Sequence, residues 1–453
     1  MIDDMLSDLK RHPWVADARW DATRNTIVVR PNAAAIAVRP EPGPLLAEHL
    51  AHWQHVYEFV YTAGELRHGD DLDLSGWRAS DTGAPFPREH MIEWIDHAVD
   101  LVLRDKPGVV LEVGCGSGLL VHRIRHQVRS YLGLDVAEPA VDRLRAQRLP
   151  GVRVLRASAH ELASAPVTDS LRTMADATAS PHRVTPDCIV LNSVTQCFPN
   201  ERYLTAVLDD ALDLVSPGGT VVVGDNRNLA NAPDYARWLE SARHPGIPAE
   251  ELTTQAASRL AADEELLCDP RVFARIARRH RRDVRVACYA KPLGADTELT
   301  RYRYDVVFTV DSPPPGPCRI RAWADLPGTS VERLRTLATE TAQSPTLITG
   351  IPNALLDGEA PDAVTPAQLA GAVPAGWAVL LDSADAHRLA VGPPEHHTGL
   401  EAVSDTGLTD RCNDPFTRFL RRRLPEVLTD HLEQHIPATP APRIAVSEEL
   451  TAP

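Results

Sequence analysis

The chain has 453 residues, more than one ordinary hydrophobic core accommodates, so we expect two or three folding units. Its 62 acidic and 47 basic residues leave a net charge of −15, which argues against a nucleic-acid or anionic-membrane partner because Coulomb repulsion would oppose the encounter. No stretch approaches the roughly 20 apolar residues of a membrane span, and the amino end carries no basic and apolar signal segment, so we expect a cytoplasmic protein.

The cysteines argue against two common kinds of stabilised small fold. There are seven of them, an odd number, and none forms a Cys-x-x-Cys pair. This pattern favours neither a disulfide framework nor a zinc ribbon. We therefore expect most of the cysteines to be small buried side chains, and we expect no metal site.

Residues 1–45 are predicted to form a small amino-terminal appendage. Apolar residues at helical spacing favour a helix near residues 2–9, and residues 25–30 are typical of a short strand. Three prolines within residues 40–44 then break any helix and mark a linker.

The next two segments are predicted to be helices. The helix expected over residues 46–63 is dense in rings, although Phe, Trp and Tyr make up only 5% of the chain. Its rings are those of His52, Trp53, His55, Tyr57, Phe59 and Tyr61. A second amphipathic helix is expected over residues 91–103. We expect a large, flat group to pack against the first of these helices.

Strands and helices then alternate from residue 109 to residue 223. The expected elements are strands over 109–113, 131–134, 152–155, 188–191 and 220–223, with helices over 119–128, 138–147 and 202–215. Such alternation with short turns predicts a parallel, doubly wound, Rossmann-like α/β sheet.

The rest of this unit, which we place at residues 46–312, adds two strands and a lid. Strands over 284–289 and 302–310 bring the sheet to seven mostly parallel strands, and the helical segment 249–267 is expected to cover the substrate cleft. Three consecutive prolines from residue 313 favour an extended spacer. Residues 313–453 are therefore predicted to form an α+β accessory domain and tail, with one basic amphipathic helix over residues 415–424.

A glycine-rich turn follows the first strand of the sheet. Residues 109–118 are Val-Val-Leu-Glu-Val-Gly-Cys-Gly-Ser-Gly, and the three glycines let a ligand lie against backbone. The next strand ends at Asp135, where an acid can accept hydrogen bonds from both ribose hydroxyls of an adenosine. Leu119 stands where the nicotinamide fingerprint has its third glycine, and the sequence has no Gly-Lys-Ser/Thr phosphate loop. The pattern therefore points to an enzyme that binds S-adenosylmethionine.

Five stretches between residues 50 and 310 resemble class I methyltransferases, most closely the domains embedded in adenylation domains of nonribosomal peptide synthetases. The stretches are Tyr57-x-x-x-Tyr61 with residues 74–83 (Leu-Ser-Gly-Trp-Arg-Ala-Ser-Asp-Thr-Gly), residues 111–118, residues 191–199 (Leu-Asn-Ser-Val-Thr-Gln-Cys-Phe-Pro), residues 224–227 and residues 298–306. Residues 9–18 and 419–425 are similar to the adenylation-domain segments that flank such an insertion. The chain lacks the host's glycine loop and catalytic lysine motif, so we expect no adenylation activity.

The resemblance implies a set of residues that hold the cofactor, S-adenosyl-L-methionine. Tyr57, Tyr61 and Trp77 would shield its methionine end, where cation–π attraction to the sulfonium is available; simple core packing is the alternative. Glu112 and Asn192 would border the methionine carboxylate and amine. The remaining cofactor-binding residues expected are Gly114, Cys115, Gly116, Gly118, Asp135, Val136, Ser158, Ala159, His160 and Ser193.

The resemblance also places polar groups at the mouth of the cleft, where an acceptor would enter. These are Gln196, Asp225, Arg227 and Glu298. A carboxylate there could take the proton of an α-amine, with Glu298 the first choice and Asp225 the second. Either acid could instead be structural, paired with Arg301 or Arg303.

Two positions depart from the family pattern. Cys197 stands where such domains usually carry an aromatic side chain, and Thr297 stands where many carry asparagine. Both departures lie beside the expected acceptor residues. The identity of the acceptor is therefore the open part of the resemblance.

The expected function is N-methylation of an amino acid or peptidyl group tethered to a carrier protein in nonribosomal peptide or related natural-product biosynthesis. The alternatives are O- or C-methylation of a soluble small-molecule intermediate, or a noncatalytic scaffold that docks a synthetase module. The expected partners are thus a small-molecule or carrier-bound substrate and a synthetase module, with no nucleic acid and no membrane.

Overall fold

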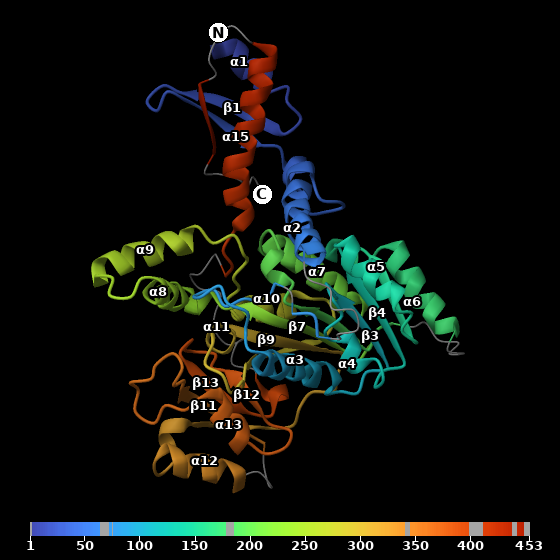
Figure 1. Ribbon diagram of the computed structural model, residues 1–453, viewed down its shortest axis with the longest axis vertical. Coiled ribbons are helices and arrows are strands. Elements are labelled where there is room, and N and C mark those ends of the chain that lie inside the picture. The colour runs from blue at the N-terminus through green and yellow to red at the C-terminus, as the bar shows by residue number, and fades with distance from the viewer. Residues whose placement is uncertain are drawn as a thin grey trace.

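A computed structural model describes residues 2–63, 72–74, 76–177, 185–339, 345–397, 411–436 and 442–447. Ser75 of the Gly-Trp motif and part of the carboxy-terminal tail lie outside these ranges. Figure 1 shows a broad central sheet with helices on both sides, a small unit at one end of the long axis and a second α+β unit at the other. No helix within the described ranges has both the length and the apolar character needed to cross a bilayer.

The segment from residue 109 to residue 310 contributes seven strands to the central sheet. They are β3 (Val109–Val113), β4 (Ser130–Asp135), β5 (Val152–Arg156), β6 (Cys188–Asn192), β7 (Thr220–Arg227), β8 (Val284–Ala290) and β9 (Arg303–Val310). Their spatial order is β5-β4-β3-β6-β7-β9-β8, parallel except for β9, which is antiparallel to both of its neighbours. All five residues of β3 are buried, as expected for a central strand covered on both faces.

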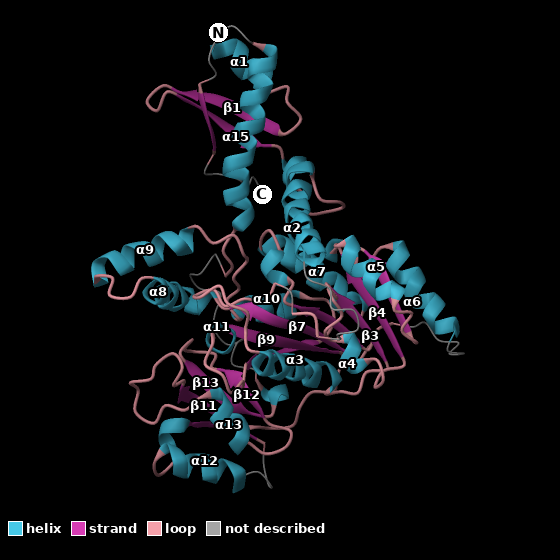
Figure 2. Cartoon of the chain, viewed as in Figure 1, coloured by secondary structure: helices cyan, strands magenta, loops and turns pink. Residues whose placement is uncertain are grey.

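Alternation along β3 separates two hydrophobic layers. Val109, Leu111 and Val113 pack in one cluster with α6, α7 and α10, whereas Val110 packs in another with α3, α4 and α5. Figure 2 shows helices above and below the magenta strands. The helices of this part of the chain are α2 (Pro44–Ala63), α3 (Arg88–Leu103), α4 (Val121–Ile124), α5 (Glu138–Ala146), α6 (Ala165–Ala177), α7 (Glu201–Leu214), α8 (Ala232–Arg243), α9 (Ala249–Ala261), α10 (Arg271–Arg279) and α11 (Glu298–Tyr302).

Several elements differ from the sequence-based expectation. The helix expected over residues 119–128 shrinks to the single turn of α4, and α6 was not predicted. Short 3-10 helices are η1 (Ala33–Ile36), η2 (Ala159–Glu161), η3 (Thr195–Cys197), η4 (Leu229–Asn231), η5 (Trp323–Asp325) and η7 (Pro394–His396). Local pattern thus located the strands of the central sheet well, but it missed the strands over residues 15–21 and 443–446 and most of the short connecting helices.

The carboxy-terminal α+β unit continues the central sheet instead of forming a separate one. Leu380 of β12 pairs with Tyr289 of β8, and the sheet runs on in the order β12-β13-β11-β10 to eleven strands in the part of the chain that the structure describes. The elements added are β10 (Arg319–Ala322), α12 (Ser330–Thr339), β11 (Thr346–Pro352), α13 (Pro366–Ala372), β12 (Ala378–Leu381) and β13 (Arg388–Gly392). The outer edge of β8 is thereby covered by hydrogen-bonded backbone.

The two terminal segments meet in one small sheet of order β1-β2-β14. It is built from β1 (Val15–Asp21), β2 (Thr26–Pro31) and β14 (Arg443–Val446), beside the helices α1 (Ile2–Leu9) and α15 (Pro415–His435). The expectation assigned residues 1–45 and 313–453 to different units, whereas backbone pairing joins their ends. In Figure 1 the blue and red ribbons lie side by side there.

Helix α15 extends well beyond the predicted end at residue 424 and passes through Pro425. Leu420, Leu424, Leu428 and Leu432 are all buried, at a spacing of four residues along one face. This apolar stripe packs into the large hydrophobic cluster and stabilises the helix on both sides of the proline.

Candidate active site

The carboxyl ends of β3, β4, β6 and β7 border a series of three adjoining cavities. The large cavity, of about 730 Å³, lies against Gly114, Asp135 and Ser193. The central cavity, of about 330 Å³, shares Gly114 and Ser193 with it. The acidic cavity, of about 650 Å³, shares Glu298 and Arg303 with the central one. Together they form a continuous series along the edge of the sheet where doubly wound folds bind ligands.

The glycine turn forms the floor of the central cavity. Gly116 has a φ of 49°, and a Cβ there would approach the hydroxyl of Tyr61. Gly114 and Cys115 also line this cavity, and both backbone N–H groups bond to the carbonyl of Leu134. Gly118 lies apart from the central cavity. A Cβ added to it would collide with Leu144 of α5 instead of facing a cavity. The structure thus brings three of the four predicted loop residues to the site.

Asp135 ends β4 with its carboxylate against the glycine turn. Its Oδ2 accepts the N–H of Gly116 at 2.7 Å, and its Oδ1 accepts the N–H of Ala137 at 2.8 Å. Only 6% of the residue is exposed, and burial raises the pKa of its carboxyl above the usual range. Each oxygen retains a second lone pair, so the group can accept further hydrogen bonds from a ligand in the large cavity.

The far side of the large cavity is built by the segment that follows β5. Ser158, Ala159 and His160 of this segment line the cavity, as does Val136, which directly follows β4. Ser158 and Glu161 form a capping box that fixes η2. The Nδ1 atom of His160 lies 3.0 Å from the hydroxyl of Tyr203, and burial lowers the pKa of the imidazole. His160 is therefore a neutral, oriented side chain in the wall.

Three rings of α2 lie at intervals of four residues and cover the cavities. Tyr57 and Tyr61 stack with their centroids 6.1 Å apart, and both line the large and central cavities. The adjacent Cys197 thiol and burial raise the pKa of Tyr57 well above its ordinary value. Trp53 lines all three cavities but was not assigned to the site, although its spacing from Tyr57 placed it on the same helical face.

The central cavity holds the other predicted methionine-side residues. Trp77 lines it and packs on Trp94 at 4.5 Å between centroids. Glu112 accepts the hydroxyl of Tyr131, and burial raises the pKa of its carboxyl to about 8, so it is protonated near neutral pH. Asn192 completes the wall at the end of β6.

Gln196 presents an unpartnered oxygen within the central cavity. Its Nε2 donates to the carbonyl of Ser193 at 2.8 Å, which leaves Oε1 buried without a hydrogen-bond partner among the described residues. An orphaned buried acceptor of this kind is rare in folded proteins. It marks a place where a donor on a bound ligand would be stabilised.

Glu298 lies at the junction of the central and acidic cavities. Its Oε2 accepts the N–H of Ser80 at 2.9 Å and its Oε1 accepts the hydroxyl of Ser80 at 2.8 Å. Glu298 forms no ion pair with any residue in the described ranges, although only 6% of it is exposed to solvent. Ser80 belongs to the Gly-Trp motif, which could have predicted this contact. Glu298 is thus an acid held by a loop and facing both cavities.

Asp225, the second predicted acid, lies beneath the site and lines none of the three cavities. It is fully buried, and its carboxylate accepts Trp94 Nε1 at 3.0 Å, Ser193 Oγ at 2.8 Å and Arg303 Nη1 at 3.1 Å. The ammonium of Lys291 lies 3.5 Å away. The carboxylate of Asp225 already accepts hydrogen bonds from these donors. The geometry therefore favours Glu298 as the acid that contacts a methyl acceptor.

The same buried network contains a second aspartate. Lys291, which is fully buried, contacts Asp305 at 2.7 Å, and the His97 ring contacts the other oxygen of Asp305 at 2.9 Å. Burial by itself would raise the pKa of Asp305, but Lys291 and His97 outweigh it and hold the pKa well below the usual range. The stabilisation from this depressed pKa is complete above the ordinary value of 3.8 and is lost as the pH falls below it.

Replacing Lys291 with methionine is expected to lower the free energy of unfolding by about 3 to 5 kcal/mol, because the buried Asp305 would lose its ammonium partner and Asp225 would keep only Arg303. Urea denaturation checks this. Lys10→Met is the matched control, since Lys10 pairs with Asp17 at the surface, where an ion pair contributes about 1 kcal/mol or less. Equal effects of the two substitutions would contradict the importance of the network.

Arg227 lines the acidic cavity, but its guanidinium is already paired with acidic side chains. It bonds to Asp263 at 2.7 and 2.8 Å and to Glu265 at 2.9 Å, and its guanidinium lies 5.0 Å from the ring of Tyr235. Asp263 and Glu265 follow α9, so Arg227 fastens the segment that the sequence predicted to be a lid. Several residues of that segment line the cavity: Gln255, Ser258, Arg259, Ala262, Asp263, Glu264 and Glu265.

The donor set fits S-adenosylmethionine. Asp135 and the wall around Ser158 suit a ribose and an adenine, and the turn at Gly116 leaves room where a Cβ would otherwise stand. The unpartnered Oε1 of Gln196 suits the ammonium of the methionine end. A bound adenosine that carries an amino-acid tail would offer a matching group to each of these protein features.

Comparison with known proteins identifies a methyltransferase domain within the chain. A family model described as a methyltransferase domain matches residues 88–261. Chondramide synthase cmdD of Chondromyces crocatus is 32% identical over 334 residues, which are 72% of this chain and 8% of that protein. The probable non-canonical nonribosomal peptide synthetase CymA of Salinispora arenicola is 34% identical over 315 residues, which are 69% of this chain and 4% of that protein.

Among solved structures, magnesium protoporphyrin IX methyltransferase of Synechocystis PCC 6803 with bound S-adenosylmethionine is 12% identical and covers 58% of this chain and 97% of that one, with a TM-score of 0.36. The matched part of the chain spans less than a tenth of the length of either of the two large biosynthetic proteins, cmdD and CymA. Residues 88–261, which carry the glycine turn and Asp135, thus match a methyltransferase domain of the S-adenosylmethionine-dependent kind, and the chain is similar to segments of nonribosomal peptide synthetases.

Proposed function

We propose that the chain methylates the amine nitrogen of an amino acid or peptidyl group tethered to a carrier protein. The observation that carries the proposal is the position of Glu298, an acid at the junction of the cofactor-side and acceptor-side cavities. When bound, S-adenosylmethionine supplies a methyl group on a positively charged sulfur. The residues of this chain orient the acceptor, exclude water and take its proton.

The acidic cavity favours a nitrogen acceptor. Five acids line it, against four arginines: Glu240, Asp263, Glu264, Glu265 and Glu298, with Arg227, Arg243, Arg259 and Arg303. Most of these charges are already paired, as Arg259 is with Glu240 and Arg227 with Asp263. An amine arrives largely as an ammonium and must lose a proton before it attacks, and Glu298 is the proton acceptor that we assign.

The cofactor is proposed to lie across the large and central cavities. Asp135 would accept the ribose hydroxyls, and the segment from Ser158 to His160 would border the adenine. Tyr57, Tyr61 and Trp77 would exclude water from the sulfonium. Their negative ring faces would also attract its charge.

A small pocket beside the acidic cavity supports a tethered substrate. This His49 pocket, of about 100 Å³, is lined by His49, His52, Trp53, Glu264, Pro415, Arg418, Phe419 and Arg422. Both ring nitrogens of His49 lack a hydrogen-bond partner in the described part of the chain, and the residue is 5% exposed. Burial and the neighbouring His52 lower the pKa of His49 to about 4.

The charge of the His49 pocket suits the phosphodiester of a carrier-protein arm. Arg418 and Arg422 are exposed at its rim, and a neutral His49 can still donate one N–H from its wall. Trp53 and Glu264 also line the acidic cavity, so a chain held at the pocket has a short path to the acceptor position.

Replacing Arg422 with alanine is expected to raise the KM for an aminoacyl-carrier substrate about three- to tenfold with little change in kcat, because one charge-assisted hydrogen bond to the arm is lost. Steady-state kinetics check this. Arg421→Ala is the control, since Arg421 is equally exposed on α15 but does not line the pocket. An equal KM in the two variants would remove the His49 pocket from the proposal.

The proposal as a whole is tested by incubating the protein with S-adenosylmethionine and either aminoacyl-carrier proteins or free amino acids. We expect a mass gain of one methyl group on the nitrogen of the carrier-bound substrate. A gain on free substrates alone, or on oxygen or carbon, would contradict it. Cofactor binding without transfer to any acceptor would favour a docking role.

A further inference from the structure

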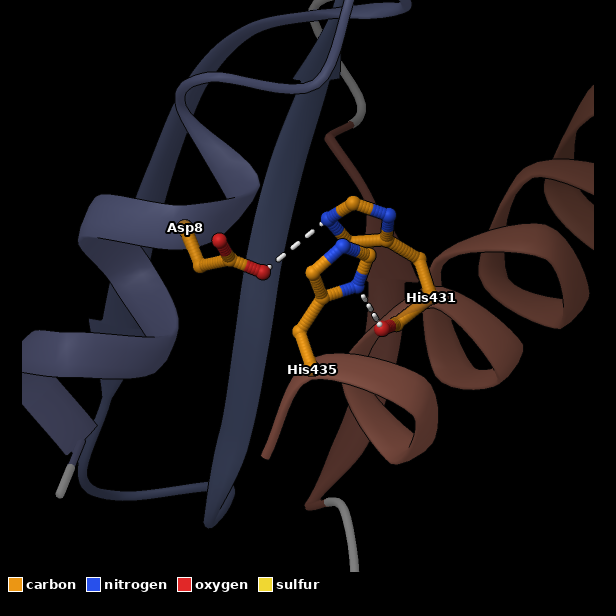
Figure 3. A group of neighbouring side chains, drawn as sticks. All are labelled: Asp8, His431 and His435. Atoms are coloured by element: carbon orange, nitrogen blue, oxygen red, sulfur yellow. Dashed lines mark hydrogen bonds and ion pairs between the residues drawn. The ribbon is translucent and has the colours of Figure 1, made fainter. Parts of the chain in front are cut away.

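The amino-terminal and carboxy-terminal segments bring three metal-binding side chains together. Asp8 near the end of α1 faces His431 and His435 on α15, with one donor atom of each residue within 4.8 Å of the others (Figure 3). The sequence predicted no metal site, since Asp8 lies almost a whole chain length away from the two histidines. Only the pairing of the terminal segments creates the group.

Two buried atoms of this group face each other without a satisfactory hydrogen bond. Asp8 Oδ2 and His431 Nε2 lie 3.0 Å apart, yet neither has a partner with good hydrogen-bond geometry among the described residues. Asp8 is 8% exposed, so water does not readily replace the missing interaction. A cation between the two atoms would satisfy both lone pairs at once.

The third side chain has the tautomer that a metal requires. Figure 3 shows His435 Nδ1 directed at the main-chain carbonyl of His431, at 2.8 Å. A donor at Nδ1 leaves a lone pair on Nε2, and most metal-bound histidines are oriented by such a hydrogen bond from the other ring nitrogen. The spacing of four residues puts both rings on one face of α15, and their centroids lie 4.1 Å apart.

We propose that Asp8, His431 and His435 bind a Zn²⁺ ion that clips α1 to α15. Two imidazoles and one carboxylate are ligands that zinc favours, with water completing the tetrahedron. Ligand atoms in such a tetrahedron are about 3.3 Å apart, so the Asp8 to His431 separation needs little change and the exposed His435 makes the remaining adjustment. This site is separate from the three cavities and does not depend on the proposed function.

The surroundings of the site determine which metal ions it favours. Arg11 donates to Asp8 Oδ1 at 2.6 Å, so it neutralises one oxygen and leaves Oδ2 for the ion. His12 packs edge-on against His431 at 5.0 Å between ring centroids. The positive charge of Arg11 opposes any cation held by charge alone, and nitrogen ligands discriminate against magnesium and calcium.

The test uses the full chain after treatment with a chelator, titrated with ZnCl₂ in a calorimeter and, separately, with Co²⁺ followed by visible absorption. We expect one saturable zinc site, a tetrahedral cobalt spectrum, and an unfolding temperature that rises with zinc and not with magnesium. Asp8→Asn and His435→Gln should each weaken zinc binding at least about tenfold. His435 is exposed, so its replacement leaves the fold intact.

His387→Gln is the matched control. His387 pairs with Asp234 at 2.7 Å, but it belongs to no three-residue group among the described residues. This variant should retain zinc binding and the cobalt spectrum. The proposal is overturned if no saturable binding occurs, or if His435→Gln binds zinc as tightly as His387→Gln does.

Discussion

Replacing Asp135 with alanine is expected to weaken S-adenosylmethionine binding by at least about a hundredfold. Two ribose hydroxyls would lose a charged acceptor, at about 1.5 to 3 kcal/mol each. The N–H groups of Gly116 and Ala137 would also lose their partner, which loosens the glycine turn. Calorimetric titration with the cofactor measures the effect.

Two further variants make this result interpretable. Asp135→Asn retains an acceptor oxygen and should bind with intermediate affinity. Asp142→Ala removes a largely exposed aspartate of α5, which pairs with Arg145 at 3.7 Å, and should bind as the wild type does. Unchanged binding by a folded Asp135→Ala variant would contradict the assignment of the large cavity to the nucleoside.

Replacing Glu298 with glutamine is expected to lower kcat about a hundredfold or more while leaving the cofactor dissociation constant within about threefold. The amide keeps the shape, its oxygen can accept the Ser80 N–H and its NH2 group can donate to the Ser80 hydroxyl, but it cannot take a proton from an ammonium. Proton acceptors of this kind contribute factors of about 100 to 10,000. Single-turnover kinetics with an aminoacyl-carrier substrate, beside calorimetry with the cofactor, separate the two effects.

The controls distinguish proton transfer from support of the loop. Ser80→Ala removes one of the two hydrogen bonds to Glu298 but keeps the carboxylate, so its kcat should fall less than about tenfold. Asp225→Asn should instead lower the midpoint of urea unfolding, because that acid holds Lys291 and Arg303 in the buried network. If Glu298→Gln and Ser80→Ala lose the same activity, Glu298 only positions the loop.

Local pattern was sufficient for the central sheet and for the nucleotide end of the site. The five residues expected in the first strand are those of β3, and Asp135 ends β4 as predicted. Buried parallel strands are continuous apolar runs, and a glycine turn followed by an acid needs only neighbouring residues to be recognised. Ser158, Ala159 and His160, which line the large cavity, were instead assigned from the family resemblance and not from a local signal.

The acceptor side depended on contacts between segments far apart in the chain. Glu298 was the first choice in sequence and Asp225 the second, with a structural role open for either. In the structure Glu298 lines two cavities, whereas Asp225 is enclosed by Trp94, Ser193 and Arg303. The partner of Glu298 is Ser80, more than two hundred residues earlier. Nothing local to either acid reveals such partners, because burial and hydrogen bonding are set by packing.

The sequence by itself determined the alternating strands, the glycine turn and Asp135, because each rests on a short run of residues whose pattern is physically sufficient. The methyltransferase resemblance came from five separate stretches. Only the tertiary structure decided that β12 extends the sheet at β8, that β14 pairs with β2, and that Asp8 meets His431 and His435. A strand edge or an apolar helix face can pair with any suitable segment that reaches it. The residues that connect the two segments do not indicate which pairing will form.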